Sequence, residues 1–269
     1  MLYAKRQSIQ GKHKMKIISY NVNGIRAAST KGLFNWLQAT DADMVCLQEV
    51  KALKEQIPEI IALIEQLGYH HYWFPAEKKG YSGVAILTKI KPNNISYGCG
   101  ESWIDAEGRI LRADFDTFSL MSLYMPSGSS GDERQIKKYE FMRFFEVYIN
   151  ELRLQFSNLI ISGDYNICHQ PIDIHNPKSN ANSSGFLPEE RSWMELFMSN
   201  GFIDSFRHFN KDPHQYTWWS YRAGSRGKNL GWRIDYHLVT KQMENRLKNV
   251  RILPDALHSD HCPVLLELE

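Results

Sequence analysis

Short apolar runs alternate along the chain with longer segments in which apolar residues recur every three or four positions. The short runs are rich in β-branched residues and predict buried strands. They lie at 17–20, 44–48, 83–87, 109–115, 118–124, 159–163, 234–239 and 264–268. The helical spacing predicts helices at 32–41, 57–67, 132–154 and 188–200, and Pro188 and Gly201 mark the start and the end of the last one.

Strands and helices are mixed throughout, and several strands are apolar on both faces. Sheets of that kind are covered on both sides by other elements. Neither a linker nor a short repeat divides the sequence. We therefore expect one layered α/β domain over residues 15–269. Residues 1–14 are basic and free of acids, and we expect an extended or disordered leader there.

The stretch 159–166 (LIISGDYN) is the pattern around which the rest is organised. We expect the strand to stop at Gly163, where the glycine lets the backbone turn. Asp164 and Asn166 then lie at the carboxyl end of the strand, the edge where ligands collect in α/β proteins. They share one side if the backbone stays extended. Taken alone, the same residues are those of an ordinary turn.

Polar side chains end or interrupt other predicted strands in the same way. An ordinary turn at 163–166 does not explain this recurrence. A carboxylate by itself is more often an ion pair or a cap than a functional group. Buried carboxylates, however, are paired or bound to metal, so several of them at strand ends predict one shared polar site. The residues are Asn21, Asn23, Gln48, Glu49, Asp164, Asn166, Asp235, Asp260 and His261.

Hard oxygen groups dominate this set and favour Mg²⁺ or Mn²⁺ over a thiolate-binding metal. The zinc patterns HExxH and CxxC are absent, and so is the GxSxG nucleophile turn of a serine hydrolase. His261 follows Asp260, and Asp235 lies in an upstream strand. An imidazole held by a carboxylate is fixed in one tautomer and can stay protonated against a phosphate oxygen.

The whole chain has a formal net charge of only +2 over 269 residues, so a polyanion partner must meet a local patch. Residues 213–234 offer one: they carry cations and aromatic rings without a carboxylate. Cations neutralise phosphates, and flat rings stack on bases or line a sugar-sized pocket. Alternatively, the tryptophans belong to the core and the cations to a solvated loop. The residues are Tyr216, Trp218, Trp219, Tyr221, Arg222, Arg226, Lys228, Trp232 and Arg233.

Four cysteines without metal-type spacing fit a reducing cytosol, and neither a secretion signal nor an apolar run long enough to span a membrane is present in the sequence. We expect a cytoplasmic protein.

Seven motifs now fall in register with a known family: YNVNGIR (20–26), LQE (47–49), GYSGV (80–84), LYMP (123–126), GDYN (163–166), GWRIDY (231–236) and SDHCP (259–263). From Lys16 onward the chain resembles the exonuclease III-type apurinic/apyrimidinic (AP) endonucleases of the DNase I-like superfamily. The resemblance implies a four-layer α/β sandwich, with two mixed sheets face to face and helices outside.

The same resemblance implies base-excision repair. The reaction would be Mg²⁺-dependent incision of duplex DNA 5′ to an abasic site, leaving a 3′-hydroxyl, with 3′-exonuclease or 3′-phosphodiesterase activity on blocked ends. The resemblance also implies a monomer and a bacterial-type, nucleoid-associated location.

By position, the resemblance also implies roles for the site residues. Glu49 would bind the metal with Asn23 and Asp260, and Asn21 would hold other site residues. Asp164 would deprotonate the attacking water. Asn166 and Tyr124 would stabilise charge on the phosphate, and Asp235 would orient His261 against it. Asp260 would also assist a leaving-group water.

The DNA contacts implied by the resemblance fall into two groups. Trp218 and Trp232 would line the pocket of the flipped-out sugar. The residues that would grip the backbone or wedge into the duplex are Arg26, Lys51, Tyr81, Asn176, Asn180 and Arg222. The chain departs from one branch of the family at position 23, which is asparagine and not aspartate, and other members differ at Arg222.

Two other functions fit the same residues. The fold could cleave a small or lipid phosphodiester or a phosphomonoester, although the basic and aromatic stretch suits DNA better. A non-catalytic nucleic-acid-binding module would need no acid, amide and imidazole cluster.

Overall fold

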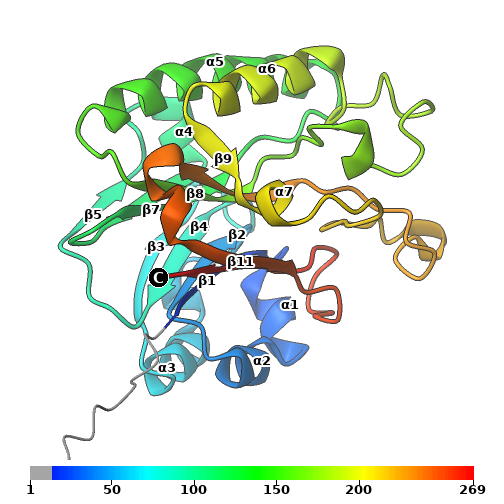
Figure 1. Ribbon diagram of the computed structural model, residues 1–269. Helices are drawn as coiled ribbons and strands as arrows, with labels where there is room; N and C mark the ends of the chain where they lie inside the picture. Colours follow the sequence, from blue (N-terminus) through cyan, green and yellow to red (C-terminus); the bar gives the residue numbers. More distant parts are fainter. Residues whose placement is uncertain (1–13) are drawn as a thin grey trace, which may run out of the picture.

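Among residues 14–269, which this computed structural model describes, two six-stranded β-sheets form the centre of the fold (Figure 1). The first sheet has the spatial order β11 (Leu247–Ile252), β12 (Val264–Leu268), β1 (Met15–Asn21), β2 (Met44–Gln48), β4 (Val84–Thr88) and β3 (His70–Phe74). The second has the order β5 (Asn94–Tyr97), β6 (Ile110–Asp114), β7 (Ser119–Tyr124), β8 (Leu159–Asp164), β10 (Asp235–Thr240) and β9 (Phe202–Asp204). All but the last residue of the expected leader lie outside the described residues.

Helices form the two outer layers, one on each sheet (Figure 1). The first sheet is covered by α1 (Ile25–Thr30), α2 (Leu33–Thr40) and α3 (Pro58–Gln66), and the second by α4 (Ser102–Ala106), α5 (Asp132–Arg153) and α6 (Pro188–Ser199). The shorter elements are α7 (Ser205–Phe209) and the 3₁₀ turns η1 (Lys54–Gln56), η2 (Pro171–Asp173), η3 (Arg222–Gly224) and η4 (Lys241–Arg246). Among the described residues, helices of the length and apolarity that a bilayer requires are absent.

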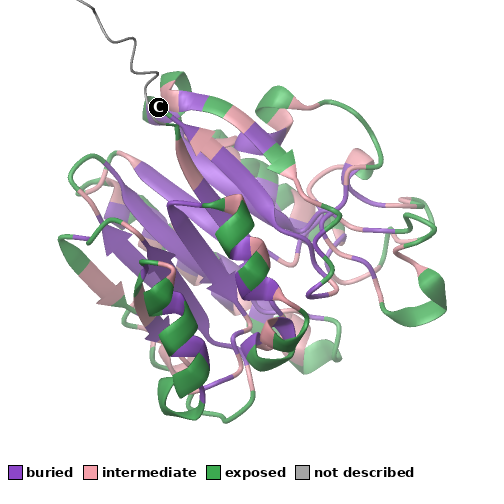
Figure 2. Ribbon diagram, turned by 90° about the horizontal axis from the view of Figure 1, so that it is seen from below, coloured by how far each residue is buried: buried purple, intermediate pink, exposed green. Residues whose placement is uncertain are grey.

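Alternation along each strand explains why both faces are apolar. Ile17 of β1 packs between the two sheets, whereas its neighbour Ile18 packs under the outer helices, because successive side chains point to opposite faces. Val239 and Leu238 of β10 divide in the same way between the central core and the helix-covered face. Figure 2 shows the result, with buried strands in the middle and helices exposed on their outer sides. The predicted four-layer sandwich is confirmed.

Strand register brings the strand ends that carry the predicted site residues to one rim of the two sheets. The parallel pair β1 and β2 sets Asn21 opposite Gln48, and the parallel pair β7 and β8 sets Tyr124 opposite Asp164. Strand β10 runs antiparallel to β8, so its first residue, Asp235, also lies opposite Asp164. Residues from distant parts of the sequence therefore meet at the same edge.

The predicted role of Gly163 is wrong, because strand β8 continues through it to Asp164. A Cβ atom at position 163 would lie 1.9 Å from the carbonyl oxygen of Leu123. The glycine thus permits close approach of strand β7, which is a common reason for glycine inside a strand. The chain turns instead at Asn166, whose φ of 52° also rules out the extended 164–166 backbone that the sequence suggested.

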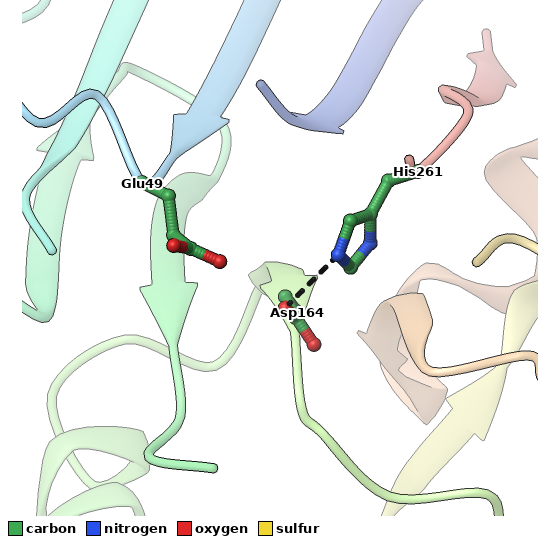
Figure 3. Close-up of side chains that lie close together, drawn as sticks. All are labelled: Glu49, Asp164 and His261. Atoms are coloured by element: carbon green, nitrogen blue, oxygen red, sulfur yellow. Dashed lines mark ion pairs between the residues drawn. The ribbon is translucent and has the colours of Figure 1, made fainter. Parts of the chain in front are cut away.

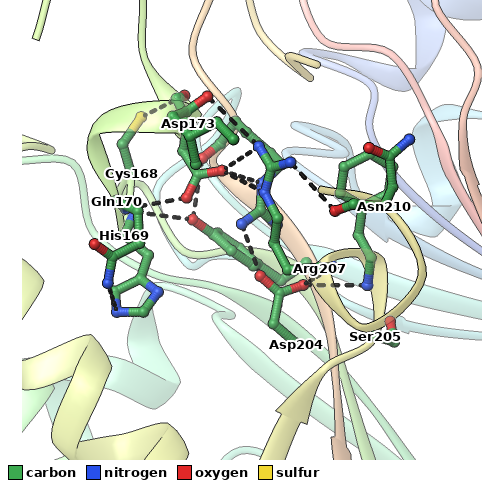
Figure 4. Close-up of polar contacts among 12 residues, drawn as sticks. Cys168, His169, Gln170, Asp173, Asp204, Ser205, Arg207 and Asn210 are labelled. Atoms are coloured by element: carbon green, nitrogen blue, oxygen red, sulfur yellow. Dashed lines mark hydrogen bonds and ion pairs between the residues drawn. The ribbon is translucent and has the colours of Figure 1, made fainter. Parts of the chain in front are cut away.

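The loop after β8 is tied to the rest of the fold by a buried charge cluster (Figure 4). The Oδ1 atom of Asp173 lies 2.7 Å from Nη2 of Arg207 and 2.7 Å from Nε of Arg233. Asp204, at the start of α7, receives a further bond from Nη2 of Arg233 at 2.7 Å. The two arginines lower the pKa of Asp173 in spite of its burial, which by itself acts in the opposite direction.

Candidate active site

Three ionisable side chains converge at the rim (Figure 3). Glu49 follows β2, Asp164 ends β8 and His261 precedes β12. One ligand atom from each lies within 4.8 Å of the others. Figure 3 shows the three side chains pointing toward a common space. Two of these residues come from the first sheet and one from the second, so the site exists only when the sheets are packed together.

Asn21 joins the two acids of this cluster. Its side-chain nitrogen donates to Oε1 of Glu49 at 2.9 Å and to Oδ2 of Asp164 at 2.8 Å. Its side-chain oxygen accepts the backbone N–H of Asn23 at 3.0 Å. An amide whose two ends are fixed in this way has one orientation, so Asn21 sets the distance between the carboxylates.

His261 is buried between acids and is held as a cation. Its Nδ1 lies 2.9 Å from Oδ2 of Asp235, and its Nε2 lies 3.8 Å from Oδ2 of Asp164. Burial alone would lower the imidazole pKa, but the charge of Asp235, with smaller contributions from Asp164 and Asp260, raises the pKa to about 10. The ring is therefore protonated at neutral pH, and its Nε2 faces the carboxylate of Asp164.

Asp164 is the opposite case, a carboxyl group whose pKa is raised to about 7. Burial is the largest cause and repulsion by Asp235 the second, while His261 and the bond from Asn21 act in the opposite direction. A carboxylate with a pKa near neutrality is well matched to accept a proton from water. The N–H of Asn166 also donates to its Oδ1 at 2.8 Å, which fixes the second oxygen.

Glu49 is paired with Lys51, whose ammonium lies 2.8 Å from Oε2. The same ammonium donates to the side-chain oxygen of Asn23. Burial, the largest single effect, would raise the pKa of Glu49, but the charge and hydrogen bond of Lys51, the hydrogen bond from Asn21 and the charge of His261 together lower it. Asn23, Glu49 and Lys51 all have positive φ, a strained conformation that clusters at functional sites.

Asp260 is held by three donors. Its Oδ1 accepts from Nδ2 of Asn23 at 3.0 Å and from the hydroxyl of Ser259 at 3.1 Å, and its Oδ2 accepts from Nε1 of Trp218 at 3.0 Å. The structure thus links Asp260 and Asn23 directly, and their metal-binding role stays a prediction.

Tyr124 packs beneath a buried arginine. The guanidinium of Arg109 lies 4.8 Å from the centre of the Tyr124 ring and donates to the Tyr124 carbonyl at 3.0 Å. The pKa of Tyr124 is raised well above its usual value, mainly by burial and then by the charge of Glu49, so its hydroxyl keeps its proton. Arg109 also donates to the hydroxyl of Tyr81 at 3.0 Å, as does Arg134 at 2.6 Å.

A cavity of about 780 Å³ opens beside these groups. Trp218 and Trp232 form part of its wall, with ring centres 5.9 Å apart and planes at 90°. Trp218 and Trp232 are only partly buried, whereas Trp219 is buried in a core cluster with Tyr216 and Cys262, so the core alternative considered from the sequence holds for Trp219 and not for Trp218. Glu49, Tyr124, Asp164, Asn166, Asp260 and His261 also line this cavity.

Asn166 lines the cavity but its amide nitrogen donates to the carbonyl of Met125 at 2.8 Å. Among the described residues, six of the expected DNA contacts do not line the cavity, and one of them, Lys51, is paired with Glu49. Arg26, Asn176 and Arg222 are exposed, and Tyr81 is partly buried. Asn180 is directed into its own loop, donating to the carbonyls of His175 and Asn176.

Three buried residues near the site were missed from the sequence: Arg109, Lys138 and Glu190. Lys138 carried a signal, because it occupies the same helical stripe as Phe141 and Phe145. A lysine on an apolar stripe is rarely fully buried without a partner. Glu190 and Arg109 had no comparable signal.

The donor set suits a hard divalent cation. Carboxylate oxygens from Glu49 and Asp164 face one space beside an open cavity, which is the arrangement Mg²⁺ uses together with water and phosphate oxygens. Lys51 already places one positive charge against Glu49, so this carboxylate is held ionised as a ligand must be.

Comparison with known proteins decides the family. Residues 18–261 match the endonuclease/exonuclease/phosphatase family. The chain belongs to this family. An exodeoxyribonuclease of Bacillus subtilis (strain 168) is 42% identical over 254 residues, which cover 94% of this chain and 98% of that protein. The DNA repair nuclease APEX1 of Danio rerio is 40% identical over 256 residues, which cover 94% of this chain and 82% of that protein.

A solved structure agrees with these relatives. An AP endonuclease from Archaeoglobus fulgidus superimposes with a TM-score of 0.86 at 27% identity, covering 95% of this chain and 99% of that one. As a member of the endonuclease/exonuclease/phosphatase family, the chain is an enzyme, a phosphodiester hydrolase of the exodeoxyribonuclease and AP endonuclease type. The resemblance identified from the sequence motifs is confirmed.

Proposed function

We propose that this enzyme hydrolyses the backbone of duplex DNA on the 5′ side of an abasic site, with Mg²⁺ as cofactor, and leaves a 3′-hydroxyl. Activity on blocked 3′ ends and 3′→5′ exonuclease action belong to the same proposal. The observation that carries it is the meeting of Glu49, Asp164 and His261 next to a cavity walled by Trp218 and Trp232. The names of the relatives, an exodeoxyribonuclease, a DNA repair nuclease and an AP endonuclease, agree with this assignment.

In the proposed reaction, a water oxygen attacks phosphorus and the bond from phosphorus to the 3′ oxygen breaks. Asp164 accepts the proton of the water, for which a pKa of about 7 is favourable. His261, protonated and held by Asp235, binds a phosphate oxygen. The Tyr124 hydroxyl and Asn166 add hydrogen bonds to the charge that develops there. A water beside Asp260 returns the proton to the leaving 3′ oxygen.

The metal would be held by Glu49 and, directly or through water, by Asn23 and Asp260. Mn²⁺ would serve in place of Mg²⁺. When bound, such an ion neutralises charge on the phosphate in the transition state. Asn23 binds Lys51 and Asp260, so the chain positions this neutral ligand at the point where one branch of the family has an acid. The neutral ligand predicts weaker metal affinity than an aspartate would give.

The cavity would take the flipped-out abasic sugar. A residue without a base unstacks at the lowest cost, and the tryptophan walls exclude a base that is still attached and paired. Arg26, Lys51, Tyr81, Asn176, Asn180 and Arg222 would contact the backbone of the two strands or enter the duplex. Such contacts position DNA without reading its sequence.

We also propose that residues 15–269 act as one catalytic domain and as a monomer. The cytoplasmic, nucleoid-associated location expected from the sequence stays a prediction.

The test is a set of parallel cleavage assays. The substrates are a labelled duplex with one tetrahydrofuran abasic analogue, the same duplex intact, a nicked duplex with a blocked 3′ end, and bis(p-nitrophenyl) phosphate. Each is incubated with Mg²⁺, Mn²⁺ or EDTA. We expect a single Mg²⁺-dependent cut 5′ to the analogue, with a product end that a DNA polymerase extends.

Two outcomes would replace the proposal. Cleavage of the small phosphodiester alone would favour a small-molecule phosphodiesterase. Duplex binding that survives Asp164→Ala, without a metal-dependent product from the parent, would favour a binding module.

A further inference from the structure

A fully buried ion pair lies behind the active site and takes no part in the chemistry described above. Lys138 of α5 and Glu190 of α6 are both inaccessible to solvent, and Nζ lies 2.6 Å from Oε1. Taking two charges out of water costs more than a single contact returns unless both groups make further bonds. The further bonds of this pair all lead to the walls of the active site.

Lys138 holds the turn formed by residues 164–166, called the catalytic turn below. Its ammonium donates to the carbonyl oxygen of Asn166 at 2.7 Å. Asn166 has positive φ, its N–H holds Oδ1 of Asp164, and its side chain is bonded to Met125. The carbonyl bond to Lys138 fixes the third polar group of Asn166. The orientation of the Asp164 carboxylate thus depends on a turn that Lys138 holds from beneath.

Glu190 holds the segment of the cavity wall that contains Gly185 and Leu187. Its Oε2 accepts the N–H of Gly185 at 2.6 Å and the N–H of Leu187 at 3.0 Å. Gly185 is pressed between the catalytic turn and the tryptophan wall: a Cβ there would lie 3.1 Å from the Asn166 carbonyl oxygen and 2.9 Å from the Trp232 ring. The two charges therefore bind, respectively, the turn that carries Asp164 and the glycine against which Trp232 packs.

We propose that Lys138 is a positioning residue for the hydrolytic reaction, and that its ion pair with Glu190 sets the spacing between the Asp164–Asn166 turn and the Trp232 wall. This inference rests on the proposed function, in which Asp164 activates water while the sugar lies against Trp232. A shift of the turn relative to that wall misaligns water and phosphorus, and misplacement by about 1 Å can cost about 100-fold in rate.

The test uses variants that separate charge balance from positioning. Lys138→Met keeps the length of the side chain but removes the donor to Asn166, and it leaves the Glu190 carboxylate with only the neutral donors Gln135, Gly185 and Leu187. The double variant Lys138→Met/Glu190→Gln has no buried charge, and the glutamine oxygen still accepts from Gly185. Lys137→Met is the matched control: it changes the neighbouring lysine of the same helix, which is exposed and paired with Glu140.

We expect Lys138→Met to lower kcat on an abasic duplex about 100-fold, with KM nearly unchanged, and to lower Tm. In the double variant, Tm should return toward the parental value while kcat stays low. Lys137→Met should behave as the parent. If kcat recovers in the double variant in step with Tm, the pair is a structural brace and the proposal is overturned. Parental kcat in Lys138→Met would overturn it as well.

A spectroscopic readout keeps this inference separate from the proposed function. In protein labelled with 5-fluorotryptophan, the Trp232 resonance is assigned from its loss in Trp232→Phe. We expect this resonance to shift or broaden in both Lys138 variants and not in Lys137→Met. A parent without turnover on abasic DNA would defeat the proposed function, and the ¹⁹F spectra would still decide whether Lys138 positions the wall. An unchanged Trp232 resonance in both Lys138 variants would contradict the positioning role.

Discussion

Replacing Asp235 by asparagine isolates what one negative charge does for His261. The asparagine has nearly the same shape, and its Oδ1 can accept from Nδ1 of His261 as the carboxylate does at 2.9 Å. The other carboxylate oxygen of Asp235 is buried without a hydrogen-bond partner among the described residues, so the amide nitrogen can occupy its place without breaking a bond. The change therefore removes the charge and leaves the packing.

The size of the effect follows from the pKa of His261. A pKa of about 10, against an ordinary 6.5, corresponds to about 5 kcal/mol in favour of the imidazolium, at about 1.4 kcal/mol per pH unit. Burial opposes this, and Asp235 is the largest favourable contribution. A neighbouring opposite charge typically moves a pKa by about 1 to 3. We therefore expect the His261 pKa in Asp235→Asn to fall to between about 7 and 9.

The assay is an NMR titration of protein labelled with ¹⁵N in the histidine rings, together with steady-state kinetics. His261 should titrate at lower pH in the variant. His237, whose pKa is lowered to about 4, mainly by burial, serves as an internal control and should not move. We expect kcat of the variant to fall below that of the parent as pH rises through the lowered pKa of His261, because the neutral ring places no positive charge against the phosphate.

The pH dependence of protein stability gives an independent check on the direction of the His261 pKa shift. The raised pKa of His261 stabilises the parent fully below pH 6.5, and this contribution is lost as pH rises toward about 10. In the variant, the loss should be complete at lower pH. The reasoning would be refuted if His261 kept its midpoint near 10 in Asp235→Asn, or if kcat were parental while the pKa fell.

Three further changes test other parts of the account. Asp164→Asn should lower kcat by about 10²–10⁴ without weakening duplex binding in a gel shift, because an amide cannot accept the proton of the water. Glu49→Gln should raise the Mg²⁺ concentration needed for half-maximal activity more than it changes the Kd for DNA. Asp173→Asn should lower the free energy of unfolding in urea by about 3–5 kcal/mol, because it removes the carboxylate that Arg207 shares with the buried Arg233. The lowered pKa of Asp173 means that this loss should be present at neutral pH and should vanish as pH falls through the folded pKa.

The contrary outcomes are equally specific. Parental turnover in Asp164→Asn would remove Asp164 from its role as base. An unchanged Mg²⁺ dependence in Glu49→Gln would remove the ligand assignment. An Asp173→Asn protein as stable as the exposed control Asp116→Asn would show that the arginine cluster does not hold the loop.

Strands and long helices could be predicted because their periodicity is local. The apolar run of β1 and the stripe of α5 are visible in the sequence alone, and the structure confirms both. Strand β3 was missed because its five residues include two histidines and lack a clear alternation. Strand β9 has three residues, which is too short for any periodic signal.

The candidate site was partly visible for a different reason. Acids and amides at strand ends stand out against apolar runs, so Asn21, Glu49 and Asp164 could be selected. The recurrence of polar strand ends predicted that they share one site, but the contacts within it depend on strand register between distant segments, which the sequence pattern does not give. The role of Gly163 was misjudged because the carbonyl of Leu123, which excludes a side chain there, belongs to a strand about forty residues earlier. Burial of Lys138 depends in the same way on a partner in another helix.

The most direct test of the central claim is a crystal structure of the enzyme with Mn²⁺ and a duplex that carries a tetrahydrofuran abasic analogue. The account predicts an anomalous Mn²⁺ peak at the carboxylate of Glu49, a backbone phosphate between Asp164 and His261, and the analogue against Trp218 and Trp232. Manganese bound away from Glu49, or DNA that leaves the cavity empty, would contradict it.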